Sequence, residues 1–175
     1  MLKVKNGDTE MVALLYQRYS RRMFGFFFRM TCDAPGSEDL VHNVFVRLLK
    51  YKNSYAEEGN FESWIFQLAR NVHHDHYRKN RRFSWKADIK EIESETPLES
   101  NNREREMEKS EELSQLDEAM QLLDHETREL IVMTKFEKMK YRAIGNLLGL
   151  KEGAVKVRVY RALKELKMKY EALNE

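Results

Sequence analysis

The sequence contains few of the residues that crosslink or interrupt regular secondary structure. It has 1 cysteine, 2 prolines and 7 glycines among 175 residues. The single cysteine, Cys32, excludes an internal disulfide and is typical of a reducing cytosol. The most apolar run, residues 23–28, is far too short to span a bilayer, and no apolar run follows Met1 as a signal peptide would require. We therefore expect a cytoplasmic protein without membrane insertion.

The sequence also lacks an alternating strand pattern and the common motifs of catalytic sites. It has no Gly-rich phosphate loop, no cysteine pair and no nucleophile–base signature. Apolar residues instead recur at helical spacing among abundant Leu, Met, Glu, Lys and Arg. These features predict an all-α fold, and we expect neither an enzyme nor a bound cofactor.

Two short helical segments meet at Gly149. The first places Ile144, Leu147 and Leu148 on one face. The second has its apolar stripe at Val155, Val159, Ala162, Leu163 and Leu166. Glycine accepts the left-handed conformation that ends many helices. The pattern predicts a helix-turn-helix, whose second helix is the one that would enter a DNA major groove.

The opposite face of that second helix carries cations beside apolar side chains. Its members are Lys156, Val157, Tyr160, Arg161 and Lys164. A DNA-reading face needs cations for phosphates and bases, and apolar groups for thymine methyls. Residues 135–169 hold 11 Lys or Arg and 3 acidic residues, a net charge of +8, whereas the whole chain is +2. This segregation is typical of a nucleic-acid-binding module, and an ordinary antiparallel helix pair would leave it unexplained.

The apolar pattern divides the chain into two small helical domains, residues 1–85 and 113–175. In the first domain we expect helices from Asp8 to Met30, from Ser37 to Leu49 and from Phe61 to Arg82. In the second, a helix capped by Asp124 should precede the helix-turn-helix. Residues 86–112 hold 10 acidic and 5 basic residues, a net charge of −5, and read as an acidic linker.

Aromatic and basic residues alternate through the third helix and the loop before it. The set is Tyr51, Tyr55, Phe61, Trp64, Phe66, Arg70, Tyr77, Arg78, Lys79, Arg81, Arg82, Phe83 and Trp85. Exposed rings beside cations suit single-stranded DNA, because bases stack on the rings while the cations hold the backbone. The alternative, equally open for Trp64, is that the first rings simply belong to the core.

A run of His73, His74, Asp75 and His76 looks like a metal cluster. On a helix, however, His73 and His76 lie on adjacent turns while the other two side chains point elsewhere. No fourth ligand is evident unless His42 or Cys32 approaches, so we expect no metal site.

Three ordered motifs resemble the extracytoplasmic-function (ECF) type of bacterial RNA polymerase sigma factor, the minimal class of the sigma-70 family. Residues 39–49 resemble its Asp-Leu-Val-Gln-Glu-Val-Phe segment. Residues 61–71, with Asp75 and Arg78, resemble its Phe-x-x-Trp-Leu-x-x-Ile-Ala-Arg-Asn run. Residues 153–163 resemble its Gly-Thr-Val-Lys-Ser-Arg-Leu-x-Arg-Ala segment. The resemblance implies a sigma factor that directs core RNA polymerase to promoters and helps to open the DNA.

The resemblance also implies roles for individual residues. Contacts with the β′ clamp of the polymerase fall to Asp39, Leu40, His42, Asn43, Phe45 and Leu48. Contacts with the −10 element fall to Asn60, Phe61, Ser63, Trp64, Arg70, Asn71, Arg78, Arg81 and Arg82. Contacts with the −35 element fall to Lys156, Val157, Arg158, Tyr160, Arg161 and Lys164. Further implied partners are the β flap, single-stranded and duplex promoter DNA, and an anti-sigma factor.

The sequence departs from the family pattern at several positions. Gly145 replaces the usual alanine, and Val157 replaces a small polar residue. Two other interpretations stay open: a stand-alone helix-turn-helix activator that does not bind the polymerase clamp, and a helical adaptor that does not bind DNA.

Overall fold

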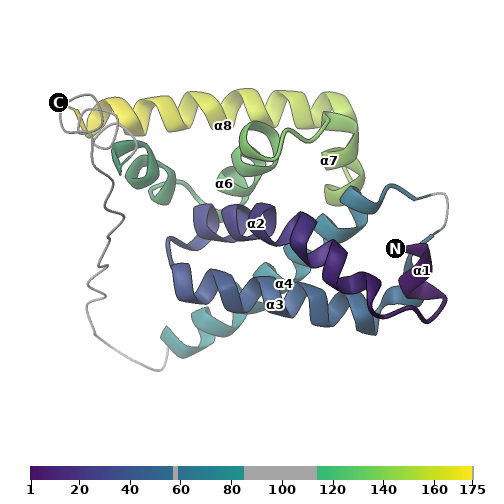
Figure 1. The fold of residues 1–175 in the computed structure, drawn as a ribbon. Coiled ribbons are helices and arrows are strands. Elements are labelled where there is room, and N and C mark those ends of the chain that lie inside the picture. Colours follow the sequence, from purple (N-terminus) through teal and green to yellow (C-terminus); the bar gives the residue numbers. More distant parts are fainter. Residues whose placement is uncertain (57–58, 85–113, 175) are drawn as a thin grey trace, which may run out of the picture.

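The computed structural model describes residues 1–56, 59–84 and 114–174, and helices are the only regular elements in them (Figure 1). The first half contains α1 (Leu2–Lys5), α2 (Met11–Thr31), α3 (Ala34–Lys50), η1 (Lys52–Ser54) and α4 (Phe61–Ser84). The second half contains a helix at 114–121, α6 (His125–Ile131), η2 (Val132–Phe136), α7 (Tyr141–Leu148) and α8 (Glu152–Ala172). The expected acidic linker, 86–112, lies outside the described residues. Among those that are described, no helix combines the length and apolar character needed to cross a membrane.

We call the described residues up to 84 the N-terminal unit and residues 114–174 the C-terminal unit. Helices α2, α3 and α4 pack together around the core of the N-terminal unit. Its fully buried side chains include Met23, Phe26, Phe27, Leu48 and Phe66. The ring centroids of Phe26 and Phe66 lie 5.9 Å apart in an edge-to-face arrangement, which joins α2 to α4. Phe66 is therefore a core residue, which is the alternative that the sequence left open for the first rings of this helix.

Two helix starts differ from the prediction. Helix α2 begins at Met11, and no described side chain caps it, so Asp8 does not do so. Helix α3 begins at Ala34 because Asp33 caps it: the Asp33 Oδ1 accepts a hydrogen bond from the Gly36 N–H at 3.0 Å. Ser37, the expected cap, lies inside the first turn and is buried.

The C-terminal unit contains the predicted helix-turn-helix, formed by α7 and α8. Gly149 ends α7 in the left-handed conformation, with φ of 66°. Ile144 of α7 and Val155, Val159 and Ala162 of α8 are buried between the elements. The predicted cap of α6 is also confirmed, since the Asp124 side chain accepts hydrogen bonds from the N–H groups of Glu126 and Thr127. After α6 the chain continues directly into a π-helical turn, η2, which the sequence did not indicate.

The C-terminal unit packs against α2 and α4 of the N-terminal unit, and the apolar residues of both form one continuous cluster. In Figure 1, α6 and α7 lie between α8 and the N-terminal helices, while α3 lies on the far side of α2. Arg128 of α6 helps to join the units. Its guanidinium donates to the carbonyls of Met120, Gln121 and Leu123, and at 2.8 Å to the carbonyl of Met30 near the end of α2. Carbonyls at helix ends have no partner within their helix, so one arginine satisfies several at once.

The first prediction concerns Gly145, in the interior of α7. Helix propensity alone favours alanine there by about 1 kcal/mol. A Cβ at this position, however, would lie 2.6 Å from the carbonyl oxygen of Leu150 and 3.7 Å from a methyl of Val155. We expect Gly145→Ala to lower the free energy of unfolding by about 1–2 kcal/mol, measured by denaturant titration.

Gly153 in the first turn of α8 provides the matched control. A Cβ there would meet no described atom within 4 Å. Gly153→Ala should leave stability equal or slightly higher. If Gly145→Ala stabilised the protein as much as Gly153→Ala, the close approach of the Leu150 carbonyl would not constrain the turn.

Candidate nucleic-acid interface

The exposed face of α8 contains all six residues expected to read the −35 element. These are Lys156, Val157, Arg158, Tyr160, Arg161 and Lys164. Val157 is 51% exposed and Tyr160 is 71% exposed, so neither side chain belongs to the core. The buried stripe on the opposite side of α8 fixes the direction of this face. The helix therefore presents a surface of cations and apolar groups that is free of core packing.

The first turn of α4 is organised by Asn60 and a group of aromatic rings. The Asn60 Oδ1 accepts hydrogen bonds from the N–H groups of Glu62 and Ser63, at 2.8 Å and 3.3 Å. Trp64 packs against Phe61 and Tyr55, with centroids 6.1 Å and 5.4 Å away. Phe61 and Trp64 pack against the core and remain partly exposed. Ser63 is also partly exposed.

Farther along α4, Asn71 and Arg78 are exposed. Asp75 links Arg78 to α3. Its carboxylate accepts a hydrogen bond from Arg78 at 3.1 Å and another from Arg47 of α3 at 2.7 Å. The hydrogen bond from Arg47 is the main reason that the pKa of Asp75 is lowered. The side chains of Arg81 and Arg82 lie outside the described residues.

Arg70 does not lie with the other residues expected at the −10 element. Its Nε lies 3.1 Å from each oxygen of the Glu129 carboxylate in α6, and its N–H points at Oε2. Glu129 is only 2% exposed, and a buried carboxylate without a cation is strongly disfavoured. In this arrangement of the two units, Arg70 is therefore held by the C-terminal unit.

The expected polymerase-binding residues of α3 separate into two groups. Asp39, His42 and Asn43 are exposed, whereas Leu40, Phe45 and Leu48 lie in the core at 3%, 6% and 0% exposure. We therefore correct the expectation that these three apolar side chains touch a partner: they support α3 from inside.

The outward face of α3 also holds residues that the sequence analysis did not select. Val46 is 63% exposed and follows His42 by one helical turn. Tyr16 of α2 adds a second element, because its hydroxyl lies 3.2 Å from the His42 Nε2. The i, i+4 spacing could have revealed Val46, but the position of Tyr16 depends on the packing of α2 against α3.

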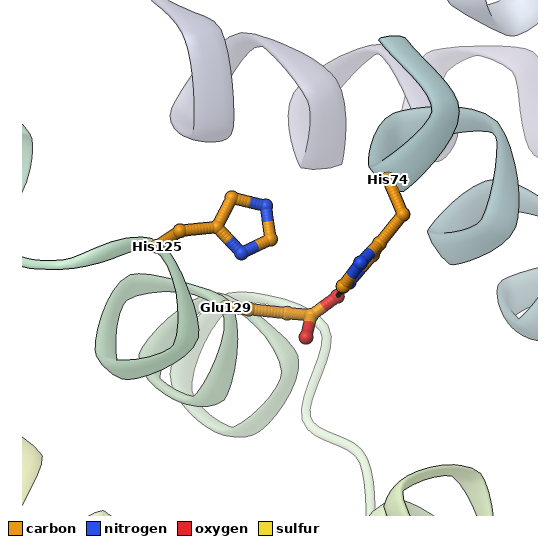
Figure 2. A group of neighbouring side chains, drawn as sticks. All are labelled: His74, His125 and Glu129. Carbon is orange, nitrogen blue, oxygen red and sulfur yellow. Dashed lines mark ion pairs between the residues drawn. The ribbon is translucent and has the colours of Figure 1, made fainter. Parts of the chain in front are cut away.

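The histidines of α4 meet residues of α6 at the contact between the two units. His73 is buried, and its Nδ1 lies 3.0 Å from the Nε2 of His125. Burial, and secondarily the neighbouring His125, lowers the pKa of His73 to about 3. His74 faces the Glu129 carboxylate, with 3.5 Å between Nε2 and Oε1 (Figure 2). Neither His125 nor Glu129 was selected from the sequence, because they come from a segment about fifty residues away.

Arg22 forms a second charged contact between the units. It donates to the carboxylate and to the backbone carbonyl of Glu137, both at 2.7 Å, and to Glu62 at 3.0 Å. Glu137 is 5% exposed. Its pKa is raised because burial disfavours the charged carboxylate, and the hydrogen bond from Arg22 offsets part of this effect.

The second prediction follows from this pair. Arg22→Ala should lower the free energy of unfolding by about 2–3 kcal/mol, because a buried carboxylate loses its cation. This is less than the full cost of breaking a buried pair, since Arg22 is partly solvated.

Two further variants make the test specific. Arg21→Ala, at the exposed neighbouring position, should cost little. Adding Glu137→Gln to Arg22→Ala should recover part of the loss, because the double variant has no unpaired buried charge. Equal stability of the two single arginine variants in denaturant unfolding would contradict the assignment.

Together these features define a helical DNA-binding protein in which a helix-turn-helix unit packs on a unit with its own set of aromatic and basic residues. Family models agree with this division: residues 15–83 match sigma-70 region 2, and residues 113–166 match sigma-70 region 4. The chain belongs to the sigma-70 family of RNA polymerase sigma factors, and to its ECF type.

Curated relatives of this type are similar over most of the chain. The ECF RNA polymerase sigma factor SigE of Mycolicibacterium smegmatis is 28% identical over 153 residues, which cover 87% of this chain and 59% of that protein. The RNA polymerase sigma factor CarQ of Myxococcus xanthus is 26% identical over 170 residues, which cover 95% of this chain and 93% of that protein.

Solved structures show the same fold. CnrH in complex with the cytosolic domain of CnrY matches with a TM-score of 0.72 at 20% identity, over 98% of this chain and 94% of that chain. The sigma factor RpoE from Bartonella quintana, in complex with the anti-sigma factor NepR, matches with a TM-score of 0.69 at 20% identity. The match covers 95% of this chain and 98% of that chain.

Proposed function

We propose that this chain directs core RNA polymerase to selected promoters in the cytoplasm and helps to open the DNA, without an active site of its own. The observation that carries the proposal is the exposed face of α8, which combines cations with Val157 and Tyr160 on the helix that a helix-turn-helix places in the major groove. The family assignment connects this face to promoter DNA.

In this proposal α8 reads the −35 element. Phosphates and bases are contacted by the four cations of this face, Lys156, Arg158, Arg161 and Lys164. Apolar base edges are contacted by Val157 and Tyr160. Val157 cannot form a side-chain hydrogen bond, so it would favour a thymine methyl over a polar base edge.

The −10 element would bind along α4. The partly exposed rings of Phe61 and Trp64 can stack on unpaired bases, while Asn71 and Arg78 are exposed farther along the helix. Arg70 is a further candidate for this surface, although its Nε is paired with Glu129 in the described arrangement. Full use of Arg70 at the −10 element would accompany movement of the C-terminal unit away from α4.

Polymerase binding would use the outward face of α3. Asp39, His42 and Asn43 are exposed there, with Val46 beside them. The C-terminal unit covers α2 and α4 but not this face in the described structure (Figure 1). The chain can therefore meet the β′ clamp before its two units separate. We assign the β flap to the C-terminal unit and expect an anti-sigma factor as a regulator.

The third prediction concerns charge reversal on α8. Lys156→Glu and Arg161→Glu should each reduce run-off transcription from −35-dependent promoters by at least about tenfold, since a base contact is worth about 1–3 kcal/mol. Binding to core polymerase should remain nearly normal, because the changed side chains lie far from α3. The measurement uses purified chain, core polymerase and a library of upstream regions, with core alone as the reference.

Lys167→Glu serves as the control, because it makes the same charge change at an exposed position of α8 one turn beyond Lys164, where the side chain pairs with Glu171. Transcription by this variant should remain close to that of the unchanged chain. Loss of polymerase binding in the Lys156 and Arg161 variants would contradict the separation of roles. Tight duplex binding by the unchanged chain without any transcripts would instead identify a stand-alone activator.

A further inference from the structure

Three side chains at the contact between the two units form a set of possible metal ligands. His74 comes from α4, and His125 and Glu129 come from adjacent turns of α6 (Figure 2). Each offers one ligand atom, and the three atoms lie within 4.8 Å of one another. The i, i+4 spacing of His125 and Glu129 directs both toward α4.

Among the described residues, two atoms of this set form no hydrogen bond, although Glu129 Oε1 lies 3.1 Å from the Nε of Arg70 in an ion pair. Within the described part of the chain, His74 Nε2 and Glu129 Oε1 are buried without a hydrogen bond. They lie 3.5 Å apart, whereas hydrogen bonds to nitrogen are usually 2.7–3.2 Å long. Buried polar atoms without a partner are rare in proteins because each loses its hydration.

A metal ion would satisfy both atoms at once. Zinc binds histidine nitrogen and carboxylate oxygen at about 2.0–2.2 Å, which places two ligands of a tetrahedral site about 3.4 Å apart. The separation of His74 Nε2 and Glu129 Oε1 is close to this value. The distance is thus long for a hydrogen bond and suitable for an edge of a coordination tetrahedron.

Neighbouring groups hold the ligands in place. Arg70 donates to Oε2 of Glu129 and thereby holds the carboxylate, whose Oε1 faces His74. His73 lies 3.0 Å from the Nε2 of His125, and the ring of Tyr77 is 4.7 Å from the His125 ring. Such outer contacts orient the ligands of many metal sites.

We propose that His74, His125 and Glu129 bind one divalent ion of the zinc class, with water as the fourth ligand. Two imidazoles and one carboxylate suit Zn²⁺ or Co²⁺ better than Mg²⁺ or Ca²⁺, which prefer oxygen ligands. Because one ligand comes from α4 and two come from α6, the ion holds the two units together and keeps Arg70 beside Glu129. Metal binding itself does not depend on the proposed function. The consequence that the ion would keep Arg70 away from the −10 element does rest on the proposed function.

The fourth prediction tests the site in the full chain. After chelator treatment, Co²⁺ titration should give the visible absorption of a tetrahedral complex with one ion per chain, and Zn²⁺ should displace it. His74→Gln and His125→Gln should each weaken binding by more than about tenfold. Zn²⁺ should raise the midpoint of thermal unfolding of the unchanged chain, but not that of His74→Gln.

His76→Gln is the matched control, because His76 lies on α4, two residues after His74, and its Nε2 pairs with Asn80 at 2.9 Å. Its metal affinity should equal that of the unchanged chain. His74 is 41% exposed at its side chain, so its replacement should leave the fold intact, and circular dichroism without metal checks this. Absence of binding, or equal affinity in all three variants, would overturn the site, while run-off transcription tests the sigma-factor proposal separately.

Discussion

The arrangement of this protein depends on two carboxylates that the C-terminal unit buries against the N-terminal unit. Glu129 is 2% exposed and Glu137 is 5% exposed, and an arginine of the N-terminal unit meets each of them. Burying either carboxylate without a cation beside it would cost several kcal/mol, because the charge is removed from water. The two pairs therefore specify how the units sit together, while the continuous apolar cluster supplies the larger part of the attraction.

This packing has a direct consequence for DNA binding. Arg70 belongs to the motif that resembles the −10-binding segment, yet in the described structure it serves Glu129. The side chain of Arg70 is 26% exposed and is held against α6 in this arrangement, so it is less accessible to DNA than an exposed cation. The face of α8, in contrast, is already exposed. The two proposed DNA-binding surfaces thus differ in accessibility, and separation of the units would change the surface on α4 far more than the surface on α8.

The sequence allowed much of the local structure to be predicted, for specific physical reasons. The apolar stripe of α8 identified the buried Val155 and Val159, and therefore also the exposed reading face. Gly149 marked the end of α7 because few other residues adopt its backbone conformation so readily. Ser37 was a wrong choice of cap. The cap is Asp33, one turn earlier, and the proline that follows it lies in the first turn of α3, where proline is well tolerated. Leu40, Phe45 and Leu48 were assigned to a binding surface because a family motif contains inward and outward positions without distinguishing them.

The sequence by itself determined the helical class, the helix-turn-helix and the segregation of basic charge, because each depends on residues close together in the chain. Only the tertiary structure decided which side chains meet across the two units. Arg22 and Glu137 are separated by 115 positions, and His74 and Glu129 by about fifty-five. No local periodicity encodes such contacts, since they arise when separate apolar faces pack and bring the polar groups at their edges within reach of one another.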